Sequence, residues 1–176
     1  MDTLVHEQET AIDSPWTLGQ RIKMVTWEYV WLLLCSWTPK PANPWRIFWL
    51  RVFGANMYGS PFVHQRARIQ IPWNLTMHHG SCLGDRANAY TLGKIEIQEY
   101  SIVAQEAYLC TGTHAFHEPA KNLITTPIKI GSHVFVGARA FIMPGITIGD
   151  NAVIGACSVV TRNVANNQSV KGNPAR

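Results

Sequence analysis

An aliphatic residue recurs every six positions over the C-terminal part of this 176-residue chain. The spacing holds without a slip through Ile130, Val136, Ile142, Ile148, Ile154 and Val160. An α-helix would need a period near 3.6 and an amphipathic strand a period near 2, so neither element explains the pattern. A period of six predicts a solenoid whose coils have three flat faces, each made of one short strand and a corner.

The same spacing returns upstream in shorter runs from Val63 onward. The phase shifts by two residues between Ile69 and Met77 and again between Ala89 and Ile97, and it is lost between Leu109 and Ile130. We interpret the two-residue shifts as corner insertions that keep the inward register. Counting from Val63 to Val164 predicts five to six coils. A β-sandwich is disfavoured because period-2 alternation and regularly spaced turn signals are missing.

Small residues follow the aliphatic ones at fixed offsets. A small or aliphatic residue stands four places on and should fit where the wall bends, as with Thr113 after Leu109 and Val164 after Val160. Glycine stands one place on in four of the six C-terminal repeats, at Gly131, Gly137, Gly149 and Gly155. We expect these glycines to supply unusual backbone geometry at tight corners.

The N-terminal part has no six-residue repeat and is predicted to be helical. Ser14 and Pro15 look like a helix start, with the helix running to about Trp37, and a second helix is expected from Pro44 to Phe53. These boundaries predict a helical cap over residues 1–56 and an all-β solenoid, a parallel β-helix, over residues 57–176, interrupted by a loop near 114–127.

Six of the seven tryptophans lie in the two predicted helices. With Lys40, Arg46 and Arg51 they resemble an interfacial membrane anchor. The favoured alternative is a cap that packs its aromatic face on the first coil or on another subunit. Either way an open solenoid end needs covering, because exposed strands invite pairing with other chains.

Charge and cysteine content restrict the partners and the compartment. The net charge of +4 comes from dispersed basic residues, which does not indicate nucleic-acid binding. Four distant cysteines without a CxxC pair argue against a disulfide framework or a zinc site. No signal peptide is expected, and the most apolar stretch, Val30–Cys35, is too short to cross a bilayer. We expect a cytoplasmic protein, with contact at the inner face of the membrane as the variant.

The break in the repeat contains a histidine beside a predicted wall. His114 follows Thr113, so a rigid coil should hold it at the base of the excursion. Histidine suits general-base catalysis because its ordinary pKa lies near working pH. The alternative is that His114 only ties the loop down through a hydrogen bond.

The motifs around His114 resemble those of the hexapeptide-repeat O-acetyltransferases that act on maltose, galactosides, nodulation factors and streptogramins. The nearest resemblance is to the subgroup associated with colanic acid biosynthesis. The motifs that carry it are Pro72–Thr76, Ala107–His114, Val30–Leu34 and Gly172–Arg176. The resemblance implies a left-handed β-helix, trimers with sites between subunits, acetyl-CoA as donor, a saccharide or sugar-lipid acceptor, and His114 as the catalytic base.

The same resemblance assigns binding residues. Asn88 is the better match for an acceptor-cleft residue and Asp85 the second, while His117 and Glu118 are further acceptor candidates. The family's CoA sites correspond to Ala138, Ala156, Thr161, Arg162, Lys171 and Arg176, to which Arg139 is added because it follows Ala138 on an outward corner. Tyr90–Gly93 lacks the carboxylate of the maltose-type enzymes, which argues against a maltose-like acceptor. The group that orients His114 stays open between Glu118 and a main-chain carbonyl.

Three other functions remain as alternatives. An antibiotic or other xenobiotic O-acetyltransferase would use the same base and donor. A β-helix without catalysis could act as a binding or scaffold protein. A zinc site of the carbonic-anhydrase kind would need histidines from neighbouring coils, but His78 and His79 are adjacent, so no metal is expected.

Overall fold

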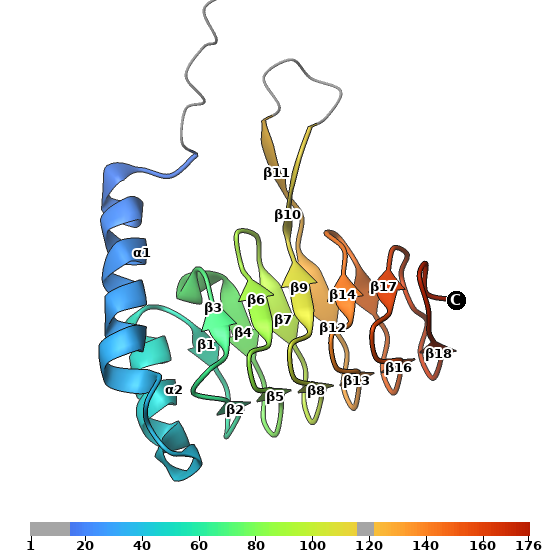
Figure 1. Ribbon diagram of the computed structural model, residues 1–176, viewed down its shortest axis with the longest axis horizontal. Helices are drawn as coiled ribbons and strands as arrows, with labels where there is room; N and C mark the ends of the chain where they lie inside the picture. Colours follow the sequence, from blue (N-terminus) through green and yellow to red (C-terminus); the bar gives the residue numbers. More distant parts are fainter. Residues whose placement is uncertain (1–14, 116–121) are drawn as a thin grey trace, which may run out of the picture.

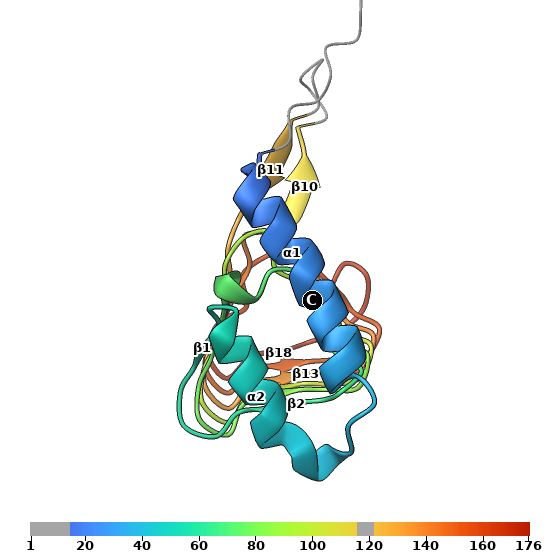
Figure 2. The same ribbon diagram turned by 90° about the vertical axis from the view of Figure 1, so that its left-hand side faces the viewer.

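The computed structural model describes residues 15–115 and 122–176, and the structural statements below concern these residues. They form a three-sided parallel β-helix with helices α1 and α2 across one end and the C-terminus at the other (Figures 1 and 2). Over the described ranges the three walls are sheets of five, six and five strands. The predicted solenoid with a helical N-terminal segment is confirmed.

Successive coils add one short strand to each wall. Sheet A contains β1 (Asn56–Met57), β4 (Leu75–Met77), β7 (Ile95–Ile97), β12 (Ile128–Ile130) and β15 (Thr147–Ile148). Sheet B contains β2 (Phe62–Val63), β5 (Cys82–Leu83), β8 (Ile102–Val103), β13 (Phe135–Val136), β16 (Val153–Ile154) and β18 (Ser169–Val170). Sheet C contains β3 (Arg68–Ile69), β6 (Asn88–Tyr90), β9 (Tyr108–Cys110), β14 (Phe141–Ile142) and β17 (Val159–Val160).

The six-residue repeat forms the core of the prism. From Ile130 to Val160 its aliphatic side chains are at most 1% exposed. Parallel pairing places equivalent residues side by side, so Ile97, Ile130 and Ile148 are neighbours across sheet A. Each aliphatic side chain therefore packs on the equivalent one of the next coil, which builds a continuous apolar column.

The glycines that follow the aliphatic residues do not supply the unusual backbone geometry that was expected of them at the corners. Gly131, Gly137, Gly149 and Gly155 are absent from the residues with positive φ. A Cβ at Gly137 would lie 2.5 Å from the amide nitrogen of Ala156 on the next coil. These glycines permit close stacking of coils. The left-handed backbone occurs two residues later, at His133, Arg139, Asn151 and Cys157, with φ between 56° and 59°.

Changes in coil length occur at the corner that leads from sheet C to sheet A. The predicted insertions between Ile69 and Met77 and between Ala89 and Ile97 lie there, the first as a 3₁₀ turn (Pro72–Asn74). The long excursion after Leu109 leaves from the same corner. After Val160 the corner is short, and Val164 bridges to Ile148 at the aliphatic position, where the sequence had suggested the small one.

The helical cap begins later than predicted. Thr17 caps α1 (Leu18–Val30): its hydroxyl accepts the Gln20 N–H at 3.3 Å, and the Gln20 side-chain oxygen accepts the Thr17 N–H at 2.9 Å. The expected start at Ser14 and Pro15 is therefore wrong. A π-helical turn (Trp31–Cys35) continues α1, and a 3₁₀ turn (Lys40–Ala42) leads into α2 (Asn43–Val52).

Both helices pack on the first coil. Trp27 is 1% exposed, contacts Trp31 and Phe53, and donates its indole N–H to the Ile69 carbonyl at 2.7 Å. Arg46, grouped above with the basic residues of a membrane anchor, is instead fully buried. Its guanidinium donates to the Val63 carbonyl at 2.9 Å and to the Thr38 hydroxyl at 2.8 Å, which ties α2 to β2. Among the described residues, no helix has the length and apolar character needed to cross a membrane.

Candidate functional site

His114 lies on a hairpin that projects from the corner between sheets C and A (Figure 1). Strand β10 (Gly112–His114) pairs antiparallel with β11 (Leu123–Thr125), and His114 is opposite Leu123. The Ala115 N–H donates to the Asn122 carbonyl at 2.9 Å and extends the pairing by one step. The excursion, expected as a loop without structure of its own, is a two-stranded ribbon at its base. This ribbon fixes the backbone of the exposed His114 relative to the wall.

The foot of the hairpin is fastened by Thr111. This residue is fully buried at the bend of the wall, where the repeat had predicted Thr113, and Thr113 instead lies half-buried on the hairpin. The Thr111 hydroxyl donates to the Tyr90 carbonyl at 2.5 Å and accepts the Gly93 N–H at 2.8 Å. A buried hydroxyl with both partners satisfied holds its element in one position. His114 therefore rises from a braced corner of the coil.

The thiols close to the core are poor candidates for carrying an acyl group. Burial raises the pKa of Cys110, at the end of β9, above its ordinary value. Burial also raises the pKa of Cys82, and it raises that of Cys35 to about 11. Because the thiolate is the nucleophile, these shifts disfavour a covalent cysteine intermediate at the three positions.

Asn88 lies on the outer face of sheet C, the wall from which the hairpin rises. Arg68, Asn88 and Tyr108 are register partners on β3, β6 and β9. The Tyr108 ring stacks on Phe141 with ring centroids 5.1 Å apart and lies 5.8 Å from the ring of Tyr90. A polar side chain among aromatic rings is a common composition for a small-molecule site.

Asp85 lies at a different corner, between sheets B and C. Its carboxylate accepts from the Arg66 guanidinium at 2.7 and 2.5 Å and lies 3.1 Å from Nδ1 of His64. Burial lowers the pKa of His64, despite the opposing effect of the Asp85 carboxylate. Asp85 thus braces this corner, and the structure does not bring it to the corner of His114. His117 and Glu118 lie outside the described residues.

Several predicted CoA-binding residues share the corner between sheets B and C near the C-terminal end. Ala138 and Ala156 lie on successive coils, joined by the hydrogen bond from Cys157 N–H to the Ala138 carbonyl at 2.8 Å. Arg139 pairs with Glu106 on the preceding coil, with Nε 2.5 Å from Oε2. An exposed ion pair of this kind contributes little stability.

The other four predicted CoA-binding residues lie at two places in the fold. Lys171 and Arg176 exchange backbone N–H···O=C bonds of 3.1 Å, which puts them together just after β18. Thr161 and Arg162 follow β17 at the corner between sheets C and A, on the exposed surface. The Val159 N–H donates to the Gly172 carbonyl at 2.9 Å and the Ala175 N–H to the Val159 carbonyl at 2.8 Å, so the C-terminal segment runs along β17, the strand that Thr161 and Arg162 follow.

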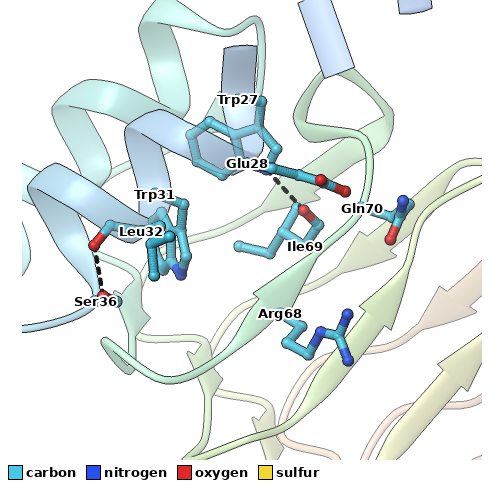
Figure 3. A pocket seen from close by; sticks show the side chains of 8 residues that line it. All are labelled: Trp27, Glu28, Trp31, Leu32, Ser36, Arg68, Ile69 and Gln70. Atoms are coloured by element: carbon cyan, nitrogen blue, oxygen red, sulfur yellow. Dashed lines mark hydrogen bonds between the residues drawn. The ribbon is translucent and has the colours of Figure 1, made fainter. Parts of the chain in front are cut away.

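Two of the hollows among the described residues lie against the solenoid, and sequence reasoning missed both. One, of about 300 Å³, lies between α1 and the first coil (Figure 3), and its lining residues are Trp27, Glu28, Trp31, Leu32, Ser36, Arg68, Ile69 and Gln70. It joins residues about forty positions apart, so no local motif could reveal it. The other, of about 270 Å³, lies along the outer face of sheet A and includes Gly131 and Gly149. The sequence carried a signal for this hollow. Both glycines occupy the same repeat position, and glycines stacked on successive coils leave a gap in the wall.

Comparison with known proteins identifies the family to which this fold belongs. Residues 127–162 match the family model described as bacterial transferase hexapeptide (six repeats). WcaF of Escherichia coli (strain K12), named as a colanic acid biosynthesis acetyltransferase, is 38% identical over 157 residues, which cover 89% of this chain and 86% of the relative.

Solved structures agree with this assignment. A maltose O-acetyltransferase from Clostridium difficile 630 matches with a TM-score of 0.83 and 27% identity, over 91% of this chain and 87% of that one. A hexapeptide-repeat acetyltransferase of Vibrio cholerae O1 biovar eltor, complexed with acetyl coenzyme A, shows the same fold with a TM-score of 0.84 and 19% identity, over 93% and 89% of the two chains. The chain is a member of the hexapeptide-repeat acetyltransferases, with their left-handed parallel β-helix.

Proposed function

We propose that this acetyltransferase moves the acetyl group of acetyl-CoA onto a hydroxyl of a saccharide or sugar-lipid, in the assembly of an exopolysaccharide or capsule. The observation that carries the mechanism is the mounting of His114 on a hairpin braced by Thr111. The sugar acceptor is supported by the sugar-modifying relatives and by the aromatic wall around Asn88.

His114 serves as the general base. Its imidazole takes the proton of the acceptor hydroxyl while the oxygen attacks the thioester carbonyl. The new C–O bond forms, the C–S bond breaks, and the imidazolium returns the proton to the departing sulfur. A rigid mount favours this step because the base keeps its position as the substrates enter.

The donor and the acceptor use different walls. Asn88 binds the acceptor on the outer face of sheet C, near the foot of the hairpin. Ala138 and Ala156, with small side chains, admit the pantetheine arm at the corner between sheets B and C. Arg139, Lys171 and Arg176 at that end suit the phosphates, because guanidinium and ammonium groups pair well with them. Thr161 and Arg162 add contacts from the neighbouring corner.

Release of CoA thiol in the presence of a sugar panel tests the proposal. His114→Ala should lower the turnover number by about 10²–10⁴-fold, because the general base is lost. His133→Asn is the matched control: His133 is exposed at another corner with φ +56°, a conformation that asparagine tolerates, and its activity should equal that of the native protein. Turnover by His114→Ala at the native rate would show that another group acts as the base.

The acceptor panel also separates the alternatives. Sugars of exopolysaccharide type, free and lipid-linked, are compared with chloramphenicol and streptogramin acceptors at equal concentration. A larger kcat/KM for an antibiotic would replace the saccharide assignment with a xenobiotic one. Absence of thiol release with every acceptor, together with tight binding of a glycan, would indicate a binding protein.

A further inference from the structure

We propose that the outer face of the helical cap docks on a lipid surface that carries anionic headgroups. This face consists of exposed apolar side chains of α1, the π-helical turn and α2. Leu18, Ile22, Val25, Tyr29 and Leu32 are 53–69% exposed, and Trp45, Phe48 and Val52 are 44–55% exposed.

The spacing of the exposed residues places them along one side of α1. Steps of four and three residues from Leu18 to Leu32 repeat at the helical period, so these side chains form one stripe. The other side of the same helix is also apolar and is already used, since Trp27 is buried and Val30 and Trp31 pack on the core. Helix α1 therefore has two apolar sides, one packed against the core of the protein and one exposed.

Helix α2 divides in the same way. Ile47 and Leu50 are buried, while Trp45, Phe48 and Val52 are exposed. The Trp45 ring also stacks on Phe48, with centroids 6.0 Å apart, and donates its N–H to the Leu34 carbonyl at 2.8 Å. That bond joins the exposed surface of α2 to the π-helical turn that continues α1. Both helices lie in front of the solenoid end (Figure 2), so a flat surface can meet both.

Charge favours an anionic lipid surface over a second copy of this chain. Residues 15–55 carry the single carboxylate of Glu28, which lines the hollow between α1 and the first coil. Arg21 lies with Leu18, Ile22 and Val25 around a shallow groove of α1, and Lys40 is exposed. Lys23 and Arg51 are turned to the first coil, where the Lys23 ammonium lies 4.4 Å from the Trp73 ring centroid and the Arg51 guanidinium donates to the Met57 carbonyl at 2.7 Å. Two copies of this face would bring like charges together. Anionic headgroups attract such residues, and tryptophan and tyrosine are enriched where apolar and polar phases meet. The geometry is that of an amphipathic helix lying in the interface plane.

Co-sedimentation of the full-length protein with vesicles provides the test. Vesicles of phosphatidylcholine alone are compared with vesicles in which about one third of the lipid is phosphatidylglycerol, the anionic share being high enough to attract basic residues. We expect the protein to bind the mixed vesicles more tightly, with binding weakened by salt. Absence of binding to the mixed vesicles, or equal binding to both kinds, would overturn the proposal.

Paired substitutions locate the contact. Ile22→Gln with Leu32→Gln removes two apolar groups from the cap face and should weaken partitioning at least about tenfold. Ile124→Gln with Met143→Gln makes the matched change away from the cap, on β11 and just after β14, where the side chains are 42% and 38% exposed, and should leave binding unchanged. All four positions are exposed, so the fold should be retained, and light scattering is run on each variant. Docking through this face would be contradicted if both pairs weakened vesicle binding equally, or if the cap pair did not weaken it. It would also be contradicted if the cap pair alone changed the oligomer mass, and that result would identify a second copy of the chain as the occupant.

Discussion

Gly137 and Gly19 present opposite situations for the same residue type. Gly137 lies where two coils approach most closely, and a Cβ there would lie 2.5 Å from the Ala156 nitrogen and 2.7 Å from the Ile154 carbonyl oxygen. Both contacts are with backbone, which has little room to move. Gly19, in the first turn of α1, would present its Cβ to open space. The solenoid therefore requires glycine at position 137, whereas α1 has room for a larger residue at position 19.

Alanine substitution should change stability in opposite directions at these two positions. Gly137→Ala should lower the free energy of unfolding by about 1–3 kcal/mol, the usual cost of overpacking. Gly19→Ala should raise it by about 0.5 kcal/mol, because alanine is the better helix former. Urea unfolding followed by circular dichroism measures both. A stable Gly137→Ala protein would mean that the coils separate more easily than their hydrogen bonds suggest.

At the scale of elements, the hairpin depends on the coil beneath it. The Thr111 hydroxyl links the start of the hairpin to Tyr90 and Gly93 of the preceding coil. The Thr126 N–H donates to the Thr111 carbonyl at 2.9 Å, so both strands of the ribbon meet at this residue. Movement at Thr111 would be carried to His114, three residues further along β10.

Thr111→Val should therefore affect both stability and catalysis. Loss of the hydroxyl leaves the half-buried Gly93 N–H without its partner, which costs about 1–3 kcal/mol. The turnover number should fall because the mount of His114 loosens. Thr113→Val, on the half-buried hairpin strand, is the control and should change stability by less than about 0.5 kcal/mol. Thermal unfolding and thiol release measure the two effects, and identical behaviour of the two variants would contradict a bracing role for Thr111.

The sequence predicted the walls better than the elements attached to them. The unbroken run from Ile130 to Val160 identified the inward residues because a coil repeats one environment every six positions. The hairpin was not predicted, because pairing of Gly112–His114 with Leu123–Thr125 depends on where the coil releases the chain. The start of α1 was misplaced because Ser14 and Pro15 resemble a cap and first position, whereas the helix begins at the capping box of Thr17 and Gln20, a signal that lies three residues further on in the sequence.

The candidate site shows the same limit. His114 could be singled out because it ends a motif beside a break in the repeat. The surroundings of Asp85 could not be predicted, because Arg66 and His64 reach it across coils nineteen and twenty-one residues away in the chain. The groove beside α1 joins Trp31 to Arg68 through the docking of the cap, which no repeat describes.

At the scale of the whole molecule, the prism presents apolar walls as well as an apolar cap. Ile102, Phe135 and Val153 are register neighbours on the outer face of sheet B and are 42–44% exposed. A row of apolar side chains on a rigid wall is a typical contact surface between subunits. We propose that the protein assembles as a homotrimer in which neighbouring subunits complete each other's sites.

Light scattering after size-exclusion chromatography should give three times the 19.7 kDa mass of one chain. Activity should then fall on dilution below the concentration at which the trimer dissociates, because each site would need two subunits. A fully active species with the mass of a single chain would contradict the shared-site arrangement.

A constant register in the walls and a variable length of chain are two requirements that usually compete. The corner between sheets C and A separates them. From Met57 to Val63, and at every later passage from sheet A to B or from B to C that the structure describes, six residues separate successive inward positions. The third passage varies from four residues after Val160 to the long hairpin after Leu109. New chain can therefore be added at one edge without shifting the packing of any wall. For protein engineering, this edge is an insertion point: loops of different length and chemistry can be grafted beside His114 to alter acceptor choice while the scaffold stays the same.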